Sequence, residues 1–110
     1  MNKPRLYALC TSTALLAVIL STATAQDAAL NGAQLFVAKA CMACHGADGR
    51  TPMMPLYPKI AGQNAGYIYN QMRDIKNGSR NNGQTMIMKG IMANVSDKEV
   101  RAIADWLSAQ

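Results

Sequence analysis

Two cysteines and the only histidine of this 110-residue chain lie within five positions, in the stretch CMACHGADG at residues 41–49. Cys41 and Cys44 are three positions apart, and His45 follows the second cysteine directly. Residues of these types can build a zinc site, a redox-active dithiol, or the covalent attachment of a haem. The rest of the chain distinguishes these chemistries.

Zinc needs four ligands, usually with a second cysteine or histidine pair further along the chain. Besides the motif only Cys10 remains, so we expect no zinc site. A thioredoxin-like dithiol belongs to a βαβ pattern, and the chain has no convincing strand pattern. C-x-x-C-H is the attachment signature of c-type haem, in which two thiols bond to the vinyl groups and the adjacent imidazole reaches the iron. This chemistry accounts for Cys41, Cys44 and His45 together.

The first 25 residues have the pattern of a secretory signal. Lys3 and Arg5 precede an apolar run at 14–20, and the segment ends in the small residues 23–25 (ATA). The apolar run is much shorter than the roughly 20 residues that span a bilayer. We therefore expect cleavage after Ala25, a periplasmic protein and no stable membrane anchor.

Residues 26–110 are long enough for one domain. A chain this short buries a marginal core and usually needs a disulfide, metal or large cofactor. A Cys41–Cys44 disulfide would close only a small loop and stabilise little. Of 11 lysines and arginines, all but Lys3 and Arg5 fall in this domain, against six acidic residues. This mild, dispersed charge does not indicate a nucleic-acid partner.

Three amphipathic helices are predicted. The first covers about 28–43 and carries the cysteine motif at its C-terminal end. The second covers about 64–77, with Ile68, Met72 and Ile75 on one face and a stop at Gly78. The third begins at a capping box formed by Ser96 and Glu99. Its predicted buried stripe consists of Val100, Ile103, Ala104 and Leu107.

Two long, poorly periodic connections separate these helices. Residues 46–63 are rich in glycine and proline, and residues 79–95 contain the methionine-rich stretch TMIMKGIM. Long structureless loops are uncommon in a small domain unless they are functional. We expect both connections to wrap around a large group.

These motifs together resemble the small class I bacterial cytochromes c, and especially one half of the periplasmic two-haem cytochromes. The matching stretches are Gly32…LF(35–36), CMACHG(41–46), DG(48–49), YPKIAGQ(57–63), QMxDIKxG(71–78), and Met88 eight residues before SD(96–97). This chain has only one haem motif, so it resembles a single-haem relative or one subunit of a larger assembly. The resemblance implies an all-α small cytochrome c fold, with three main helices and long loops around one covalent haem.

The resemblance also implies roles for single residues. Cys41 and Cys44 would form the thioethers to one haem c, and His45 would be the proximal iron ligand. The distal ligand would be a methionine, which with histidine raises the reduction potential. The carbonyl of Pro58 would accept the N–H of the proximal imidazole and fix its orientation.

Spacing before the third helix favours Met88 as the distal ligand. Met86 and Met92 remain alternatives, because methionine also packs well over a cofactor. Met53 and Met54 are expected to pack in the loop. The resemblance further places Gly32, Phe36 and Trp106 where the first and last helices cross, and Lys39, Lys59, Lys76 and Lys89 could surround the haem edge.

The implied function is one-electron transfer between periplasmic redox proteins that dock transiently at the haem edge, with no enzymatic activity of its own. A first alternative is an electron-accepting haem subunit of a periplasmic oxidoreductase, such as a sulfur-compound dehydrogenase. A second is a haem enzyme or gas sensor with an open iron position. Ligation by both His45 and a methionine would close that position, which disfavours the second alternative.

Overall fold

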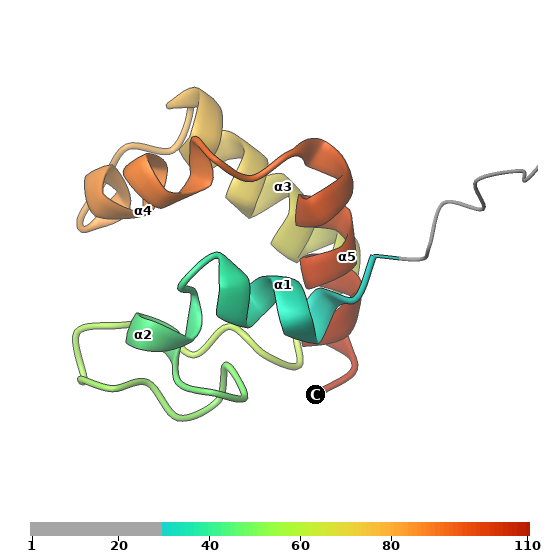
Figure 1. Cartoon of the computed structure of the whole chain (residues 1–110). Helices are drawn as coiled ribbons and strands as arrows, with labels where there is room; N and C mark the ends of the chain where they lie inside the picture. Colours follow the sequence, from blue (N-terminus) through green and yellow to red (C-terminus); the bar gives the residue numbers. More distant parts are fainter. Residues whose placement is uncertain (1–29) are drawn as a thin grey trace, which may run out of the picture.

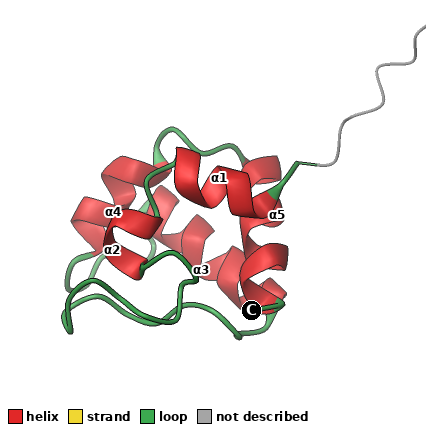
Figure 2. Cartoon of the chain, turned by 60° about the horizontal axis from the view of Figure 1, so that its bottom comes forward, coloured by secondary structure: helices red, strands yellow, loops and turns green. Residues whose placement is uncertain are grey.

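The described part of the chain, residues 30–110 of a computed structural model, contains helices as its only regular structure (Figure 1). This confirms the all-α prediction, although five helices form rather than three. Figure 2 shows them joined by long loops. The expected signal, residues 1–25, lies outside the described residues. The helices are α1 (Gly32–Ala38), α2 (Met42–His45), α3 (Ala65–Asn77), α4 (Thr85–Met92) and α5 (Asp97–Ser108).

The prediction of one continuous helix over 28–43 is wrong, because the chain turns sharply before the cysteine motif. Ala40 has a φ of 60°, in the left-handed region that ends helices. The N–H of Cys41 then donates to the carbonyl of Phe36, and that of Ala40 donates to Val37. This pair of bonds is the Schellman arrangement. It lets the single-turn helix α2 start in a new direction.

The prediction for α3 is confirmed nearly to the residue. The Asn64 side chain accepts a hydrogen bond from the N–H of Tyr67 at 3.2 Å and caps the N-terminus. Gly78 ends the helix with a φ of 87°, a conformation that costs glycine little. The residues Ile68, Met72 and Ile75 are buried on the predicted face.

The expectation that 79–95 is a loop is wrong, because its methionine-rich part forms α4. Apolar residues lie on both faces of this helix, which hides the usual periodicity, and Gly90 lowers its intrinsic helix propensity. The packing is nevertheless one-sided: Met92 is buried, whereas Met86 and Ile87 are exposed. Tertiary contacts with α3 therefore stabilise a helix that the sequence pattern does not indicate.

The capping box at the start of α5 is confirmed. The Ser96 N–H donates to the Glu99 carboxylate at 2.7 Å, and the Glu99 N–H donates to the Ser96 hydroxyl at 3.3 Å. Glu99 also pairs with Lys39 at 3.0 Å, which joins the end of α1 to the start of α5. Hydrogen bonds from the Ser96 N–H and the Lys39 ammonium lower the pKa of Glu99.

The two terminal helices cross where Gly32 meets α5. A methyl group at Gly32 would collide with the carbonyl oxygen of Ala102 and with Cβ of Trp106. Next to this contact, the ring centroids of Phe36 and Trp106 are 5.0 Å apart, and Phe36 is completely buried. The predicted crossing of the first and last helices is thus observed, and the small size of Gly32 allows it.

The loop between α2 and α3 is closed by backbone hydrogen bonds. The N–H groups of Ile60 and Ala61 both donate to the carbonyl of Gly49, at 2.8 and 3.1 Å. The N–H of Gly62 donates to the carbonyl of Leu107 at 2.9 Å and ties the loop to α5. A compact loop whose ends meet in this way holds residues 50–59 in a defined position. No helix within residues 30–110 is long and apolar enough to cross a membrane.

Candidate functional site

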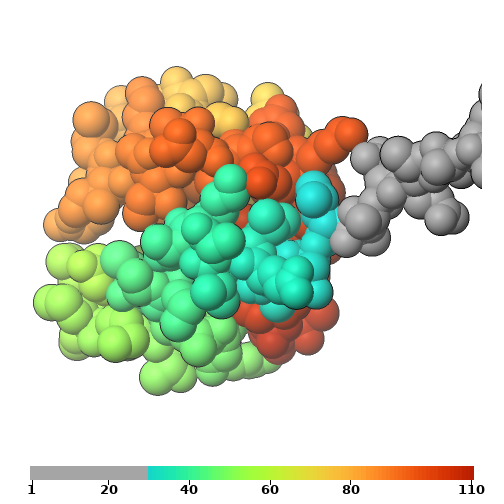
Figure 3. All heavy atoms as spheres, in the orientation of Figure 1, coloured from blue at the N-terminus to red at the C-terminus, as the bar shows by residue number. Residues whose placement is uncertain are grey.

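A cavity of about 570 Å³ lies between two halves of the molecule. Helix α2 and the following loop form one wall, whereas α3, α4 and the segment between them form the other. Both ribbon views place α2 and α4 at the same end of the domain (Figure 1, Figure 2). Figure 3 shows the surface hollowed between the α4 segment and the loop before α3. The volume falls within the roughly 300–1,000 Å³ of typical cofactor pockets.

The cysteine motif lies on the first wall, and all three of its functional residues line the cavity. One helical turn brings Cys41 and Cys44 to the same face, because residues three apart are neighbours on a helix. Both are free thiols in this structure. Burial raises the pKa of the Cys41 thiol, so it is protonated at neutral pH.

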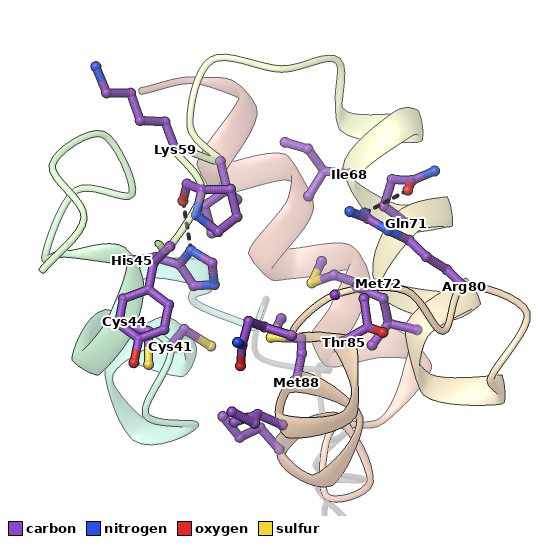
Figure 4. A pocket seen from close by; sticks show the side chains of 18 of the residues that line it. Cys41, Cys44, His45, Lys59, Ile68, Gln71, Met72, Arg80, Thr85 and Met88 are labelled. Atoms are coloured by element: carbon purple, nitrogen blue, oxygen red, sulfur yellow. Dashed lines mark hydrogen bonds between the residues drawn. The ribbon is translucent and has the colours of Figure 1, made fainter. Parts of the chain in front are cut away.

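His45 is buried, and a backbone carbonyl of the loop that follows α2 holds its ring in place. Its Nδ1–H donates to the carbonyl oxygen of Pro58 over 2.9 Å (Figure 4). This bond fixes the ring plane and leaves Nε2 facing the cavity. The closed loop holds Pro58 in place, since Ile60, two residues after Pro58, is hydrogen-bonded to Gly49. The sequence-based pairing of His45 with Pro58 is present in the structure.

Of the methionines weighed as distal ligands, the structure brings only Met88 to the cavity wall. Figure 4 shows it across the cavity from His45. Met86 has 67% of its surface exposed and does not line the cavity, whereas Met92 is 1% exposed within the core. Met53 and Met54 are exposed in the loop and do not line the cavity.

Three further cavity residues were missed as site residues by the sequence analysis. Met72 was predicted only as part of a buried helix face, yet that face forms the cavity wall. Gln71, in the middle of α3, and Arg80, just beyond its end, also line the cavity. The stretch between Gly78 and Thr85 is polar and aperiodic, and no local pattern in it indicated a site.

The four lysines that could have surrounded the cavity separate into different environments. Lys59 lines the cavity. Lys39 is paired with Glu99, and Lys76 donates to the carbonyl of Val95, so both hold the start of α5. Lys89 is on α4 but outside the cavity lining. The structure therefore does not support a ring of four lysines at this opening.

The residues present fit a covalently attached haem. Two free thiols and an imidazole share one wall, and a thioether faces them from the other wall. Between them the walls are mostly apolar, with Ile68, Met72 and Ile75 from α3. A flat apolar group with a central metal would fill this space and supply the core that so short a domain otherwise lacks.

Comparisons with known proteins agree with this chemistry. A sequence model of the family described as Cytochrome c matches residues 29–110. Cytochrome c4 of Pseudomonas aeruginosa is 43% identical over 86 residues, which cover 78% of this chain and 39% of that protein. Cytochrome c-554(548) of Halomonas halodenitrificans is 34% identical over 70 residues, covering 64% of this chain and 83% of that protein.

A relative whose name states a role in electron transfer and a solved structure extend the comparison. The thiosulfate dehydrogenase electron acceptor of Stutzerimonas stutzeri is 42% identical over 72 residues, covering 66% of this chain and 32% of that protein. Reduced cytochrome c4 from Pseudomonas stutzeri superimposes with a TM-score of 0.61 at 33% identity, covering 70% of this chain and 45% of that one. The chain thus spans less than half the length of several of these relatives.

The family match spans most of the chain, and the cavity carries two thiols, an imidazole and a thioether, the residues that attachment and ligation of such a haem need. The helical fold agrees as well, because the cytochrome c4 structure aligns with most of the described domain. This chain belongs to the cytochrome c family, whose members hold a covalently bound c-type haem.

Proposed function

We propose that this chain is a periplasmic one-electron carrier that holds one haem c through thioethers to Cys41 and Cys44. His45 and Met88 are its axial ligands, and Pro58 orients His45. The observation that carries the proposal is the placement of His45 and Met88 on facing walls of one cavity, with both thiols beside the histidine. When bound, the haem supplies an iron that exchanges a single electron.

The chain's own residues favour such exchange without ligand loss. The bond from Nδ1 of His45 to Pro58 holds the imidazole in one orientation and increases its basicity as a ligand. The thioether of Met88 favours ferrous iron and thus a higher potential. Ile68 and Met72 are buried in the cavity wall and exclude water from the centre.

The opening of the cavity suits brief docking of a redox partner. Leu56 and Ile87, on opposite rims, are each 58% exposed and also line the cavity. Electron-transfer complexes use small, weak interfaces, and these exposed apolar side chains at the cavity opening would contribute to such a contact.

Covalent attachment tests the proposal directly. The protein is exported with its first 25 residues as the proposed leader, matured in a bacterial periplasm, denatured, and assayed for haem that stays with the polypeptide. We expect one haem per chain, and none in a Cys41→Ala/Cys44→Ala variant. Wild-type protein without covalent haem would contradict the proposal. Mass spectrometry of the same sample checks cleavage after Ala25.

A second function is favoured by one specific observation, the 42% identity to a thiosulfate dehydrogenase electron acceptor. In this alternative the chain is a permanently docked, electron-accepting subunit of an oxidoreductase. Co-purification distinguishes the two: a free carrier elutes alone at the size of one domain, whereas a subunit elutes with its enzyme. A haem enzyme with an open iron site is disfavoured, because Met88 occupies the wall opposite His45.

A further inference from the structure

Helix α4, which carries Met88, is held mainly at its C-terminal end. Its start has no side-chain cap, and Met86 and Ile87 near that start are exposed. At the other end, Met92 and Val95 are buried in the core. The position of Met88 therefore depends on what holds the C-terminal end of the helix.

Residues 93–96 connect α4 to α5 and form a corner, hereafter the α4–α5 corner (Figure 1). The N–H groups of Asn94 and Val95 donate to the carbonyls of Ile91 and Met92, at 3.3 and 3.1 Å. Bonds of this i to i+3 type add a tight turn to the end of a helix. Because the corner continues α4 in this way, a contact that fixes the corner also fixes the end of α4.

Two lysine ammonium groups bind consecutive carbonyls of the α4–α5 corner. Nζ of Lys39 donates to the carbonyl oxygen of Asn94 over 2.8 Å, and Nζ of Lys76 donates to that of Val95 over 2.5 Å. Carbonyl groups at the C-terminal end of a helix carry partial negative charge, so cationic donors suit them. Hydrogen bonds with a charged donor are also stronger than neutral ones.

The two lysines reach the corner from different parts of the molecule. Lys39 is the C-cap residue of α1 and comes two residues before Cys41. Its bond to Asn94 spans 55 residues and links the segment that leads into the cysteine motif to the end of α4. Lys76 belongs to the last turn of α3, the helix against which α4 packs. The corner is thereby tied to both walls of the cavity.

Carboxylates at the start of α5 orient both ammonium groups. Oε1 of Glu99 lies 3.0 Å from Nζ of Lys39, and Oδ1 of Asp97 lies 4.0 Å from Nζ of Lys76. Both carboxylates belong to the first turn of α5, directly after the corner. Each lysine therefore joins a carbonyl before α5 to a carboxylate within it, which fixes how α4 runs into α5.

We propose that Lys39 and Lys76 are positioning residues for Met88, whose thioether their bonds to the α4–α5 corner keep on the iron. The role rests on the ligation proposed above. Neither lysine lines the cavity, so each acts through the backbone rather than by touching the cofactor. Without these bonds α4 should move away from the wall of His45 more often while the rest of the domain stays folded, because weakly held elements open locally.

The test is the displacement of the thioether by imidazole in oxidised, haem-loaded protein, followed by loss of the far-red methionine–iron band. Imidazole binds only when Met88 has left the iron, so its apparent affinity reports the fraction of open protein. From the loss of a hydrogen bond to a charged group we expect Lys76→Gln to bind imidazole about tenfold more tightly than wild type. Lys39→Gln should shift the affinity in the same direction. Lys76→Arg can still donate to the carbonyl and should retain the wild-type affinity.

Arg73→Gln is the matched control, because Arg73 lies on the same helix as Lys76, loses the same charge and also pairs with Asp97, at 3.4 Å. Its side chain donates to the hydroxyl of Tyr69 rather than to a corner carbonyl, so its imidazole affinity should match wild type. Gly32→Ala weakens the domain away from the corner and should also leave this affinity unchanged. It separates local opening of α4 from a general loss of stability.

Hydrogen exchange measures the same opening without an added ligand. In Lys76→Gln the amides of α4 should exchange about tenfold faster, while those in the middle of α5 keep their wild-type rates. If that variant does not fold, Lys39→Gln decides by the same two measurements. Imidazole affinities equal to that of Arg73→Gln would overturn the inference, whereas wild-type protein without covalent haem or without the methionine–iron band would overturn the proposed function first.

Discussion

The two walls that face the cavity differ in how firmly the chain holds them. His45 is 7% exposed and bonded to Pro58, and a loop closed by hydrogen bonds to Gly49 supports that contact. Helix α4, which carries Met88, has no side-chain cap at its start, contains Gly90 and exposes Met86. The histidine wall is preorganised, whereas the methionine wall depends on packing against α3.

This difference suits a site with two unequal ligands. A ligand whose ring is held by a hydrogen bond stays in place without its partner, while a thioether on a short helix is more easily displaced. We therefore expect loss of the methionine ligand to alter ligation, and changes behind the histidine wall to alter the stability of the domain.

The largest expected effect is on ligation, in Met88→Ala. Loss of the thioether should leave covalent haem in place, abolish the methionine–iron absorption band, and let carbon monoxide bind to reduced protein. Optical spectra with and without carbon monoxide provide the measurement. Met86→Ala is the matched control and should behave like wild type, because Met86 is exposed and outside the cavity lining. Native ligation in Met88→Ala would mean that another residue is the ligand.

The next effect concerns the crossing of α1 and α5, behind the histidine wall. Gly32→Ala forces a methyl group against the Ala102 carbonyl and Trp106, and overpacking of this kind costs about 3 kcal/mol of unfolding free energy. Urea denaturation of the haem-loaded protein measures it. A stability equal to wild type would show that the two helices separate easily and that the crossing does not support the site.

A smaller effect is expected at the start of α5. Ser96→Ala removes one half of the capping box and should lower the unfolding free energy by about 1 kcal/mol. In a separate variant, Glu99→Gln removes a carboxylate whose pKa is lower in the folded protein. Its stabilisation is present above the unfolded pKa of about 4.3 and lost as the pH falls through the folded value.

Denaturation at several pH values tests whether the Glu99 charge stabilises the domain. The difference in stability between wild type and Glu99→Gln should be largest near neutral pH and shrink in acid. A difference that stays constant from pH 7 down to pH 3 would mean that the Glu99 charge plays no part. Asp105→Asn is the control, because Asp105 lies towards the opposite end of the same helix, away from the cap.

The smallest expected effect is on the stability of α4, in the methionine wall. Gly90→Ala should stabilise the protein by about 0.5–1 kcal/mol, because alanine is the better helix former and a Cβ at Gly90 meets nothing within 4 Å. Thermal unfolding measures it against Gly32→Ala, the same change with the opposite expected sign. Destabilisation by Gly90→Ala would show that α4 needs the freedom that glycine gives.

The features that could be predicted from the sequence are those formed by residues close together along the chain. The capping box at Ser96 and the stop at Gly78 are short-range patterns, and the structure places both as expected. The C-x-x-C-H motif is equally local, but it lies on the separate helix α2 rather than at the end of a longer first helix. The break at Ala40 was missed, because an alanine with positive φ leaves no mark in the sequence. Its conformation depends on hydrogen bonds to Phe36 and Val37, which only the folded chain shows.

The methionine wall was less predictable, because it too depends on contacts that form only in the folded chain. Helix α4 packs one-sidedly although its sequence is apolar on both faces, so periodicity could not reveal it. Arg80 and Gln71 are nine residues apart and join only after α3 ends and the chain folds back. The choice of Met88 followed from a resemblance and a spacing; Met88 lines the cavity, whereas Met86 and Met92 do not.

The most direct measurement of the central claim is the visible spectrum of the wild-type protein after maturation in a bacterial periplasm, oxidised and reduced, with and without carbon monoxide. We predict a covalent haem, a far-red methionine–iron band in the oxidised state, and no response of the reduced protein to carbon monoxide. Rapid binding of carbon monoxide would contradict the closed His45 and Met88 site and favour a ligand-binding function. Absence of covalent haem would contradict the account as a whole.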